Sequence, residues 1–507
     1  MEVLSYISII DLELDVSIEV SPLLRKLNPK ISAILLNEEN FALAKQYWQH
    51  TGDGISSRRA EFCHGLFKQK LLTPATSQLI PPDTSQRPFR GPRRYHRPDS
   101  SIDGLAPGPE SRPEKASTPH KLQDQESTRF VEERFGRNLD LTLAESAKSA
   151  IRRRIAGSLH PDIAFGAEIL LPGITGAIKV DILEERDVYL FPAGMNAIFT
   201  THRALLAARG LHKSINLGFP YVDTLKVLQK FGPGCLFYGF ASDEDLDNLE
   251  TRLQAGERYL ALFCEFPGNP LLMCPDLKRI RRLADEFDFL VVIDETIGTF
   301  ANIDVLHIAD VIVSSLTKIF SGDSNVMGGC AVLNPRGQHY KAVKVAMEEC
   351  YEDTYWPEDV IFMERNSRDF TSRVERANTN ADAICNVLVN HPLVCKVYYP
   401  RINASRPNYD AYRLPTGGYG GLLSIVFNQE AHAQAFYDSL KIAKGPSLGT
   451  NFTLCSPYVL LAHYQELEWA AKYGVNPSLV RVSVGLEETS ELIQTFIEAL
   501  QTADSAG

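Results

Sequence analysis

The stretch VVIDETIGTFANIDVLHIADVIVSSLTKIF, residues 291–320, holds two apolar runs that each end in polar residues. The first run stops at Asp294, and the second stops just before Ser315, Thr317 and Lys318. Runs that are apolar throughout are typical of strands buried on both faces, as in a parallel sheet covered by helices. Because such sheets bind ligands at the carboxyl ends of their strands, these polar residues are candidate site residues.

The same alternation of apolar runs and helical patterns extends to both sides of this stretch. Ser242 followed by Asp245 marks a helix start, and Gly210, Gly232 and Gly256 mark helix ends. Strands are predicted at 188–191, 214–219, 235–240, 259–266, 289–294, 311–316 and 330–333. Helices are predicted at 194–210, 221–232, 242–256 and 276–287, with a long helical stretch at about 355–390. The pattern predicts a large α/β domain with a mostly parallel, doubly wound sheet.

The remaining sequence divides into three further regions. Residues 369–507 predict a smaller α+β domain, with strands at 395–400, 420–427 and 479–486 and helices at 431–443 and 490–503. Residues 1–70 predict a small appendage without a chemical motif, and residues 71–127 a linker or mobile loop rich in proline. The N-terminal arm and the large domain are then expected over 128–368. Within the linker, the arginines of RPFRGPRRYHRP (87–98) are interpreted as solvated, with a patch for an acidic partner as the alternative.

Composition narrows the class of protein. The chain has 507 residues, of which 44% are hydrophobic and 23% charged, which is typical of a soluble globular protein. Its formal charge of −11 disfavours general nucleic-acid binding, which requires cationic side chains to neutralise phosphates. No apolar run approaches the roughly 20 residues of a membrane helix, and the N-terminus lacks a basic signal-peptide region. The nine scattered cysteines are expected to be reduced thiols, so the predicted location is the cytoplasm.

The prediction of a cofactor-dependent reaction rests on Lys318. A lysine directly after a buried strand is poorly explained by packing, although a solvated surface lysine is the structural alternative. A lysine amine can form a Schiff base with pyridoxal 5'-phosphate (PLP), while a carboxylate such as Asp294 keeps the ring nitrogen protonated. The hydroxyls of Ser315 and Thr317 would donate to the phosphate. In PAGMNAI, residues 192–198, Gly194 and Met195 open a helix after a strand, where free backbone N–H groups bind anions.

These motifs together resemble the Cys/Met-metabolism PLP enzymes of the cystathionine γ-synthase type over about residues 128–505. The resemblance implies PLP-dependent transferase fold type I, amino-acid substrates and a homodimer or homotetramer. It also implies that Tyr221 stacks on the cofactor ring, that Asn269 lies by its phenolic oxygen, and that Arg481 holds the substrate carboxylate. The motifs that carry it are PAGMNAI, FPYVDTLKVL (219–228), CEFPGNPLL (264–272), VVIDET (291–296), SSLTKIFSGDSNVMGG (314–329), GPSLGT (445–450) with Ser447, and LVRVSVGLEE (479–488). Two stretches, RFVEERFGRNLDL (129–141) and SLGTNF (447–452), resemble the fungal members of this family.

The sequence departs from the family pattern at three places. The Y-x-R motif, which reaches the neighbouring subunit's phosphate, reads Phe135-Gly136-Arg137, so only the arginine carries over. Phe452 stands where many members have a glutamate that helps recognise amino-acid substrates. The glycines of Y-G-G-T are replaced by Val222 and Asp223.

Three functions follow as alternatives. The first is γ-replacement on an O-acylhomoserine, with Lys318 and Tyr221 as catalytic residues and cysteine as the nucleophile, giving cystathionine. The second keeps the chemistry but adds a carbon or other nucleophile to a vinylglycine-type intermediate in secondary metabolism, and is motivated by Phe452 and the divergent N-terminal residues. The third is a regulatory homologue without activity. No metal site is predicted.

Overall fold

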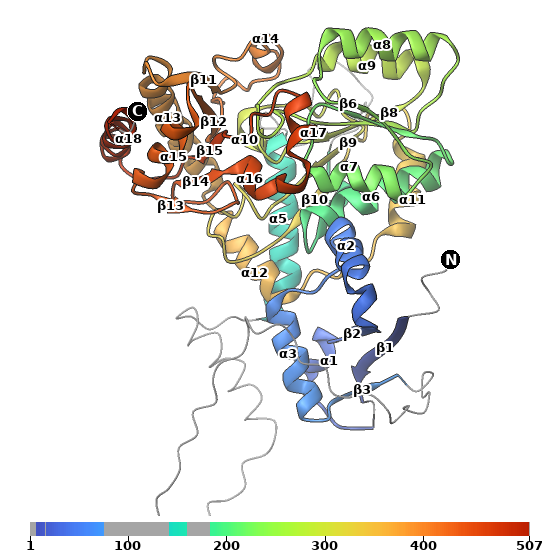
Figure 1. Cartoon of the computed structure of the whole chain (residues 1–507). Helices are drawn as coiled ribbons and strands as arrows, with labels where there is room; N and C mark the ends of the chain where they lie inside the picture. Colours follow the sequence, from blue (N-terminus) through green and yellow to red (C-terminus); the bar gives the residue numbers. More distant parts are fainter. Residues whose placement is uncertain (1–6, 16, 76–140, 160–182, 506–507) are drawn as a thin grey trace, which may run out of the picture. The chain divides into compact units, whose positions relative to one another are not determined.

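The computed structural model describes residues 7–15, 17–75, 141–159 and 183–505 (Figure 1). They belong to two compact units. The first unit draws on the ranges Met1–Asn40 and Arg59–Asp140, and the second on Phe41–Arg58 and Leu141–Gly507. The linker predicted at 71–127 lies almost wholly outside the described residues, as does Arg137. The predicted domain boundaries therefore stay predictions.

The first unit contains a three-stranded antiparallel sheet in which β1 (Ile7–Leu14) lies between β2 (Ile31–Leu36) and β3 (Leu72–Pro74). Helix α1 (Pro22–Leu27) starts at the capping residue Ser21, whose hydroxyl accepts from the backbone N–H of Leu24 at 3.2 Å. The small hydrophobic core of this unit consists of Val20, Leu24, Cys63, Leu66 and Leu72.

The large sheet of the second unit has seven strands in the order β4-β10-β9-β8-β7-β5-β6. Strand β10 runs antiparallel to both of its neighbours, and the other pairs are parallel. This confirms the prediction of a mostly parallel α/β sheet. The strands are β4 (Val188–Phe191), β5 (Ser214–Leu217), β6 (Cys235–Tyr238), β7 (Ala261–Glu265), β8 (Leu290–Asp294), β9 (Val311–Ser314) and β10 (Gly329–Leu333).

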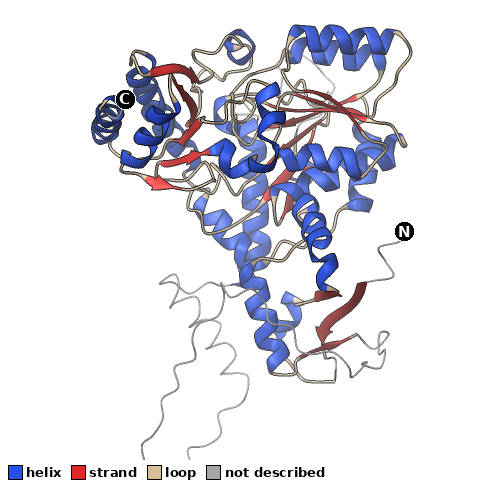
Figure 2. Cartoon of the chain, viewed as in Figure 1, coloured by secondary structure: helices blue, strands red, loops and turns tan. Residues whose placement is uncertain are grey.

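Helices cover both faces of this sheet, as the doubly wound pattern predicts (Figures 1 and 2). Ser242 caps α8 and forms a capping box with Asp245, as its sequence predicts. The helix α7 ends at Lys230, two residues before the predicted end at Gly232. The helices in this part of the chain are α5 (Ala144–Leu159), α6 (Gly194–Arg209), α7 (Val222–Lys230), α8 (Asp243–Gln254), α9 (Leu277–Phe287), α10 (Thr299–Asn302) and α11 (Tyr340–Cys350).

The long helical stretch predicted at about 355–390 is helical but consists of two helices. They are α12 (Pro357–Asn366) and α13 (Phe370–Val389). The carbonyl of Asn366 accepts from Arg373 Nη2 at 2.8 Å, and the Phe370 N–H bonds the Ser367 carbonyl at 3.3 Å. The turn between the helices therefore places the Asn366 carbonyl against a side chain rather than in a continuous helix.

The C-terminal part forms a five-stranded sheet in the order β11-β12-β15-β14-β13, covered by α13, α15 and α18. The strands are β11 (Val394–Tyr398), β12 (Leu422–Phe427), β13 (Ala443–Lys444), β14 (Leu454–Pro457) and β15 (Val480–Ser483). The further helices are α14 (Arg406–Asp410), α15 (Glu430–Ser439), α16 (Tyr458–Ala462), α17 (Leu467–Lys472) and α18 (Thr489–Asp504). The smaller α+β architecture is confirmed, while β13 and β14 were not predicted from the sequence.

Within the described ranges, every helix is too short or too polar to cross a membrane. All nine cysteines are described, and all are free.

Candidate active site

Three neighbouring strands end at the same edge of the large sheet and bring the candidate residues together. Glu265 and Asp294 are register partners on the parallel strands β7 and β8. Asp294 Oδ1 accepts from the backbone N–H of Thr296 at 2.9 Å, and Thr296 Oγ1 accepts from the Ser315 N–H at 2.8 Å. The end of β8 is thus tied to the residue that follows β9.

Glu265 and Asp294 form a buried pair of carboxylates. Burial raises the pKa of Glu265 to about 8, with the Asp294 charge adding to the shift, and burial also raises the pKa of Asp294. Glu265 accepts from the backbone N–H groups of Asn269, at 2.9 Å, and of Tyr221. Among the described residues, no lysine or arginine contributes to either shift. The pair therefore suits a cationic ring nitrogen brought by a ligand.

Lys318 lies in the loop after β9, and its amine reaches the smaller α+β part of the same unit. Lys318 Nζ donates to Ser447 Oγ at 3.1 Å. Burial and the charge of Arg481 lower the pKa of Lys318 to about 8. The amine is therefore more readily neutral, and so nucleophilic, than an ordinary lysine.

Arg481, on β15, is 2% exposed and anchors a network beside Lys318. It donates to Asn269 Oδ1 at 3.0 Å and to the Ser447 carbonyl at 2.9 Å. Its guanidinium lies 4.2 Å from the centre of the Tyr458 ring, and Tyr458 OH accepts from Asn269 Nδ2 at 2.9 Å. Ser447, Asn269 and Arg481, predicted from separate motifs, thus meet in one network.

The first turn of α6 lies directly against the residue after β9. A Cβ atom on Gly194 would lie 2.7 Å from the Cβ of Ser315, so only glycine permits this approach. The helix starts at Gly194, and Met195 follows in its first turn. The unbonded N–H groups of such a turn favour an anion. The Thr317 hydroxyl already has two partners: it donates to the Gly328 carbonyl at 3.2 Å and accepts from the Gly328 N–H at 3.1 Å. Its predicted contact with a phosphate stays a prediction.

Tyr221 precedes α7, and its side chain is 45% exposed. Protein around its hydroxyl raises the pKa of Tyr221, and the Asp223 carboxylate raises it further as a charge and as a hydrogen-bond partner. The hydroxyl is therefore protonated at neutral pH. Phe452, the departure in the SLGTNF segment, is 44% exposed.

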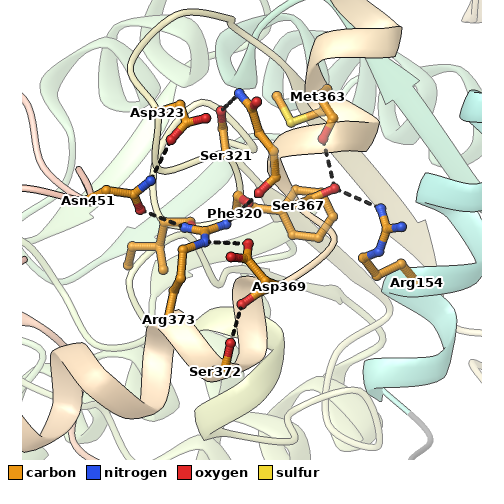
Figure 3. A network of polar contacts seen from close by, with 12 residues as sticks. Arg154, Phe320, Ser321, Asp323, Met363, Ser367, Asp369, Ser372, Arg373 and Asn451 are labelled. Carbon is orange, nitrogen blue, oxygen red and sulfur yellow. Dashed lines mark hydrogen bonds and ion pairs between the residues drawn. The ribbon is translucent and has the colours of Figure 1, made fainter. Parts of the chain in front are cut away.

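Sequence reasoning missed Arg373, which holds the loop after Lys318 (Figure 3). This arginine is 8% exposed and donates to the carbonyls of Ile319 at 3.1 Å and Phe320 at 2.9 Å. It also bonds Asn451 Oδ1 at 3.0 Å and pairs with Asp369 at 2.9 Å. Nothing in the sequence distinguishes it from Arg376, the other arginine of α13, because the carbonyls of Ile319 and Phe320 are far away in the chain.

Two family models match this chain. Residues 179–501 match the family model described as Cys/Met metabolism PLP-dependent enzyme. Residues 3–56 match the fungal trans-sulfuration enzyme N-terminal domain.

Individual relatives span nearly the whole chain. A cystathionine gamma-synthase of Neurospora crassa is 57% identical, over 99% of this chain and 83% of the relative. The cystathionine gamma-synthase-like enzyme iboG2 of Amanita muscaria is 43% identical, over 93% of this chain and 76% of the relative. A crystal structure of cystathionine gamma synthase from Xanthomonas oryzae, in complex with cystathionine, aligns with a TM-score of 0.57 at 23% identity, over 71% of this chain and 99% of that one.

The chain is a PLP-dependent enzyme. It belongs to the Cys/Met metabolism PLP-dependent family, with a fungal trans-sulfuration N-terminal domain. The residues present fit the cofactor: a lysine with a lowered pKa, a buried carboxylate pair without a cation, and a helix start that only glycine can form beside Ser315. In the described ranges, no cluster of three or more His, Cys, Asp or Glu side chains could hold a metal ion.

Proposed function

We propose that this enzyme replaces the γ-substituent of an O-acylhomoserine with cysteine and so forms cystathionine. The observation that supports the proposal best is the network in which Lys318 bonds Ser447 and Arg481 bonds Ser447 and Asn269. It brings a basic amine beside a buried arginine, the side chain type that pairs most strongly with carboxylates. The name of the Neurospora crassa relative supports the same reaction.

We assign the cofactor-binding roles from the sequence motifs, together with the contacts of those residues that the structure describes. We assign Gly194, Met195, Ser315 and Thr317, with Arg137 of a neighbouring subunit, to the phosphate. Asp294 is assigned to the ring nitrogen, and Tyr221 and Asn269 to the ring and its oxygen. When bound, the cofactor supplies an electron sink for carbanion chemistry.

The catalytic and substrate roles belong to the protein's own groups. Lys318 is assigned to cofactor attachment and to proton transfers at the substrate's α- and β-carbons. A pKa of about 8 lets one amine both accept and donate protons near neutral pH. Tyr221, protonated at neutral pH, is assigned to assist one of these transfers. Arg481 and Ser447 are assigned to the substrate's α-carboxylate.

A second candidate keeps the reaction but changes the nucleophile. The exposed Phe452 offers an apolar surface where many family members have glutamate, which disfavours recognition of a second zwitterionic amino acid. This favours a carbon or other apolar nucleophile.

We also propose that the chain works as a homodimer or homotetramer in the cytoplasm. The support is the family's Y-x-R motif, of which this chain keeps Arg137, since that arginine serves a neighbouring subunit's cofactor. Light scattering of the purified protein tests the assembly, and a monomer that retains full activity would contradict it.

The central experiment combines one variant with a substrate panel. Lys318→Ala should remove the visible absorption band of the lysine–cofactor linkage and lower turnover about 10³-fold or more. Lys278→Ala, at an exposed lysine of α9, is the matched control and should change neither. Wild-type enzyme is then given O-acetyl- or O-succinylhomoserine with cysteine, other thiols and carbon nucleophiles, and products are read by mass spectrometry. An unchanged band in Lys318→Ala contradicts the assignment, and absence of any γ-substituted product contradicts the proposed reaction.

A further inference from the structure

The chain between the end of α2 (Phe41–Thr51) and Arg58 contacts several parts of the candidate active site. Helix α2 packs on α6 and α7 within the second unit (Figure 1). These two helices begin at Gly194 and directly after Tyr221. The sequence of residues 1–70 carries no chemical motif, and none of the family motifs named above lies in this segment.

The first contact is with Asp223. Gln49 Nε2 donates to Asp223 Oδ2 at 3.2 Å, and His50 Nε2 lies 3.5 Å from Asp223 Oδ1. The side chains of His50 and Asp223 are only 9% and 5% exposed. Burying a carboxylate is costly unless polar partners replace its water. Gln49 and His50 therefore help to keep Asp223 in its place.

Asp223 in turn acts on Tyr221, which lies two residues earlier. Burial raises the pKa of Tyr221, and the Asp223 carboxylate raises it further as a charge and as a hydrogen-bond partner. Asp223 also lies in the first turn of α7, in which the Thr224 N–H donates to the Tyr221 carbonyl at 3.0 Å. Holding Asp223 therefore also holds the turn that begins directly after Tyr221. The end of α2 is thus linked to Tyr221 through one side chain, and that side chain stands at a position where the family motif has glycine.

The second contact is with the first turn of α6. Asn196, next to Met195, donates from Nδ2 to Asp53 Oδ1 at 2.7 Å. Gly52 has a φ of +70°, and a Cβ atom there would lie 2.5 Å from the backbone nitrogen of Asn196. Only glycine permits both this conformation and this approach. The turn after α2 therefore lies directly on the helix start assigned to the phosphate.

The third contact fixes the far end of the segment. Arg58 Nη1 bonds Asp359 Oδ1 at 2.8 Å, and Nη2 bonds the Asn325 carbonyl at 2.7 Å. The Arg58 guanidinium also lies 4.4 Å from the centre of the Phe362 ring. Asn325 belongs to the loop that follows Lys318, so the segment is held at both ends by parts of the site.

From these contacts we infer that residues 49–58 are a positioning segment of the active site, in which Gln49 and His50 hold Asp223 and thereby orient Tyr221. The inference rests on the proposed function, since that proposal assigns Tyr221 to the cofactor and to proton transfer. It gives residues of the fungal N-terminal domain match, 3–56, a positioning part in the active site. Gln49 and His50 are positioning residues, because they touch Asp223 rather than the reacting atoms.

A double-mutant cycle in the full-length holoenzyme tests the inference. Gln49→Ala/His50→Ala should lower kcat about tenfold when Tyr221 is present, and less than about twofold in a Tyr221→Phe background. Asp223→Asn, which keeps the shape of the side chain, should show the same coupling and decides the matter if the double variant folds poorly. Gln46→Ala is the matched control, because Gln46 accepts from Lys230 on α7 at 3.3 Å without touching Asp223.

Hydrogen exchange provides a readout that does not depend on activity. Peptides from 221–230 should exchange faster in Gln49→Ala/His50→Ala than in wild type or Gln46→Ala. Equal losses of kcat in both Tyr221 backgrounds, or unchanged exchange in 221–230, would overturn the inference. The visible band that depends on Lys318 should persist in these variants, so failure of this inference is distinguishable from failure of the proposed function.

Discussion

The buried Arg481 and the partly buried Lys318 lie close together in the candidate site, which is unusual because burial penalises a charge. Lys318 and Arg481 share Ser447, through its hydroxyl and its carbonyl respectively. Arginine stays charged under nearly all conditions, so the lysine is the group that gives up its proton. The positive charge of Arg481 thus helps to lower the pKa of Lys318, whose neutral amine is the nucleophile.

We predict that Lys318 in cofactor-free protein titrates with a midpoint near pH 8, below its ordinary value of 10.5. Since the neutral amine is the reactive form, acetic anhydride should label Lys318 increasingly as pH rises through 8. Other lysine peptides, read in the same mass spectra, serve as internal controls with midpoints near 10.4. Arg481→Gln should move the Lys318 midpoint upward. Labelling of Lys318 in step with the other lysines would contradict the assignment.

At the scale of elements, the loop after β9 depends on a helix of the following part of the chain. Arg373 of α13 holds the carbonyls of Ile319 and Phe320, and Gly322 leaves room for it, since a Cβ there would lie 2.2 Å from Arg373 Nη1. Buried carbonyls without partners cost free energy. The position of Lys318 is therefore determined partly by α13.

We predict that Arg373→Met lowers the local unfolding free energy of the loop at 319–328 by about 3 kcal/mol, because several buried carbonyls lose their donor. Native-state hydrogen exchange should then be roughly a hundredfold faster in that loop. Arg368→Met is the control, since Arg368 is 65% exposed and pairs with Glu364 at the surface. Its effect should stay within about 0.5 kcal/mol. Equal effects of the two variants would show that the carbonyl contacts of Arg373 contribute little.

The strands of the large sheet and their order of appearance could be predicted because uniformly apolar runs have few alternatives. VYLF and LVVID became β4 and β8 with bounds close to those predicted. The break between α12 and α13 could not, since it depends on the Asn366 carbonyl meeting Arg373 in three dimensions. The candidate site followed from motifs, whereas His50 and Gln49 carry no motif and gain their importance only from packing against Asp223.

At the scale of the whole molecule, the buried carboxylates couple cofactor binding to stability. The pKa of Glu265 is raised to about 8, whereas in an unfolded chain it would be about 4.3. Between these values the folded state binds more protons than the unfolded state. Stability from this group is therefore present at low pH and is lost as pH rises through 8.

We predict that cofactor-free protein becomes less stable as pH rises from 6.5 to 8, by at most about 1.4 kcal/mol per pH unit for one proton. Burial lowers the pKa of His202 to about 4, so this group makes the protein more stable as pH rises. That effect is complete near pH 6.5, the ordinary pKa of histidine, and therefore lies below this window. Thermal unfolding midpoints against pH provide the measurement. The loaded enzyme should show a smaller change, and Glu265→Gln should flatten the curve of the cofactor-free protein. A midpoint that rises over this window would contradict the assignment.

The partners in the site are far apart in the chain, and this has a consequence for synthesis on the ribosome. Asn269 and Arg481, which bond at 3.0 Å, are separated by 212 residues. At about 5–20 residues per second, roughly 10–40 seconds pass between their translation. From the moment Lys318 has been translated, the lysine, the carboxylate pair and the anion-binding turn are all made, while the arginine that completes the substrate site is not. The nascent enzyme can therefore acquire the parts that hold its cofactor before it acquires the part that selects its substrate.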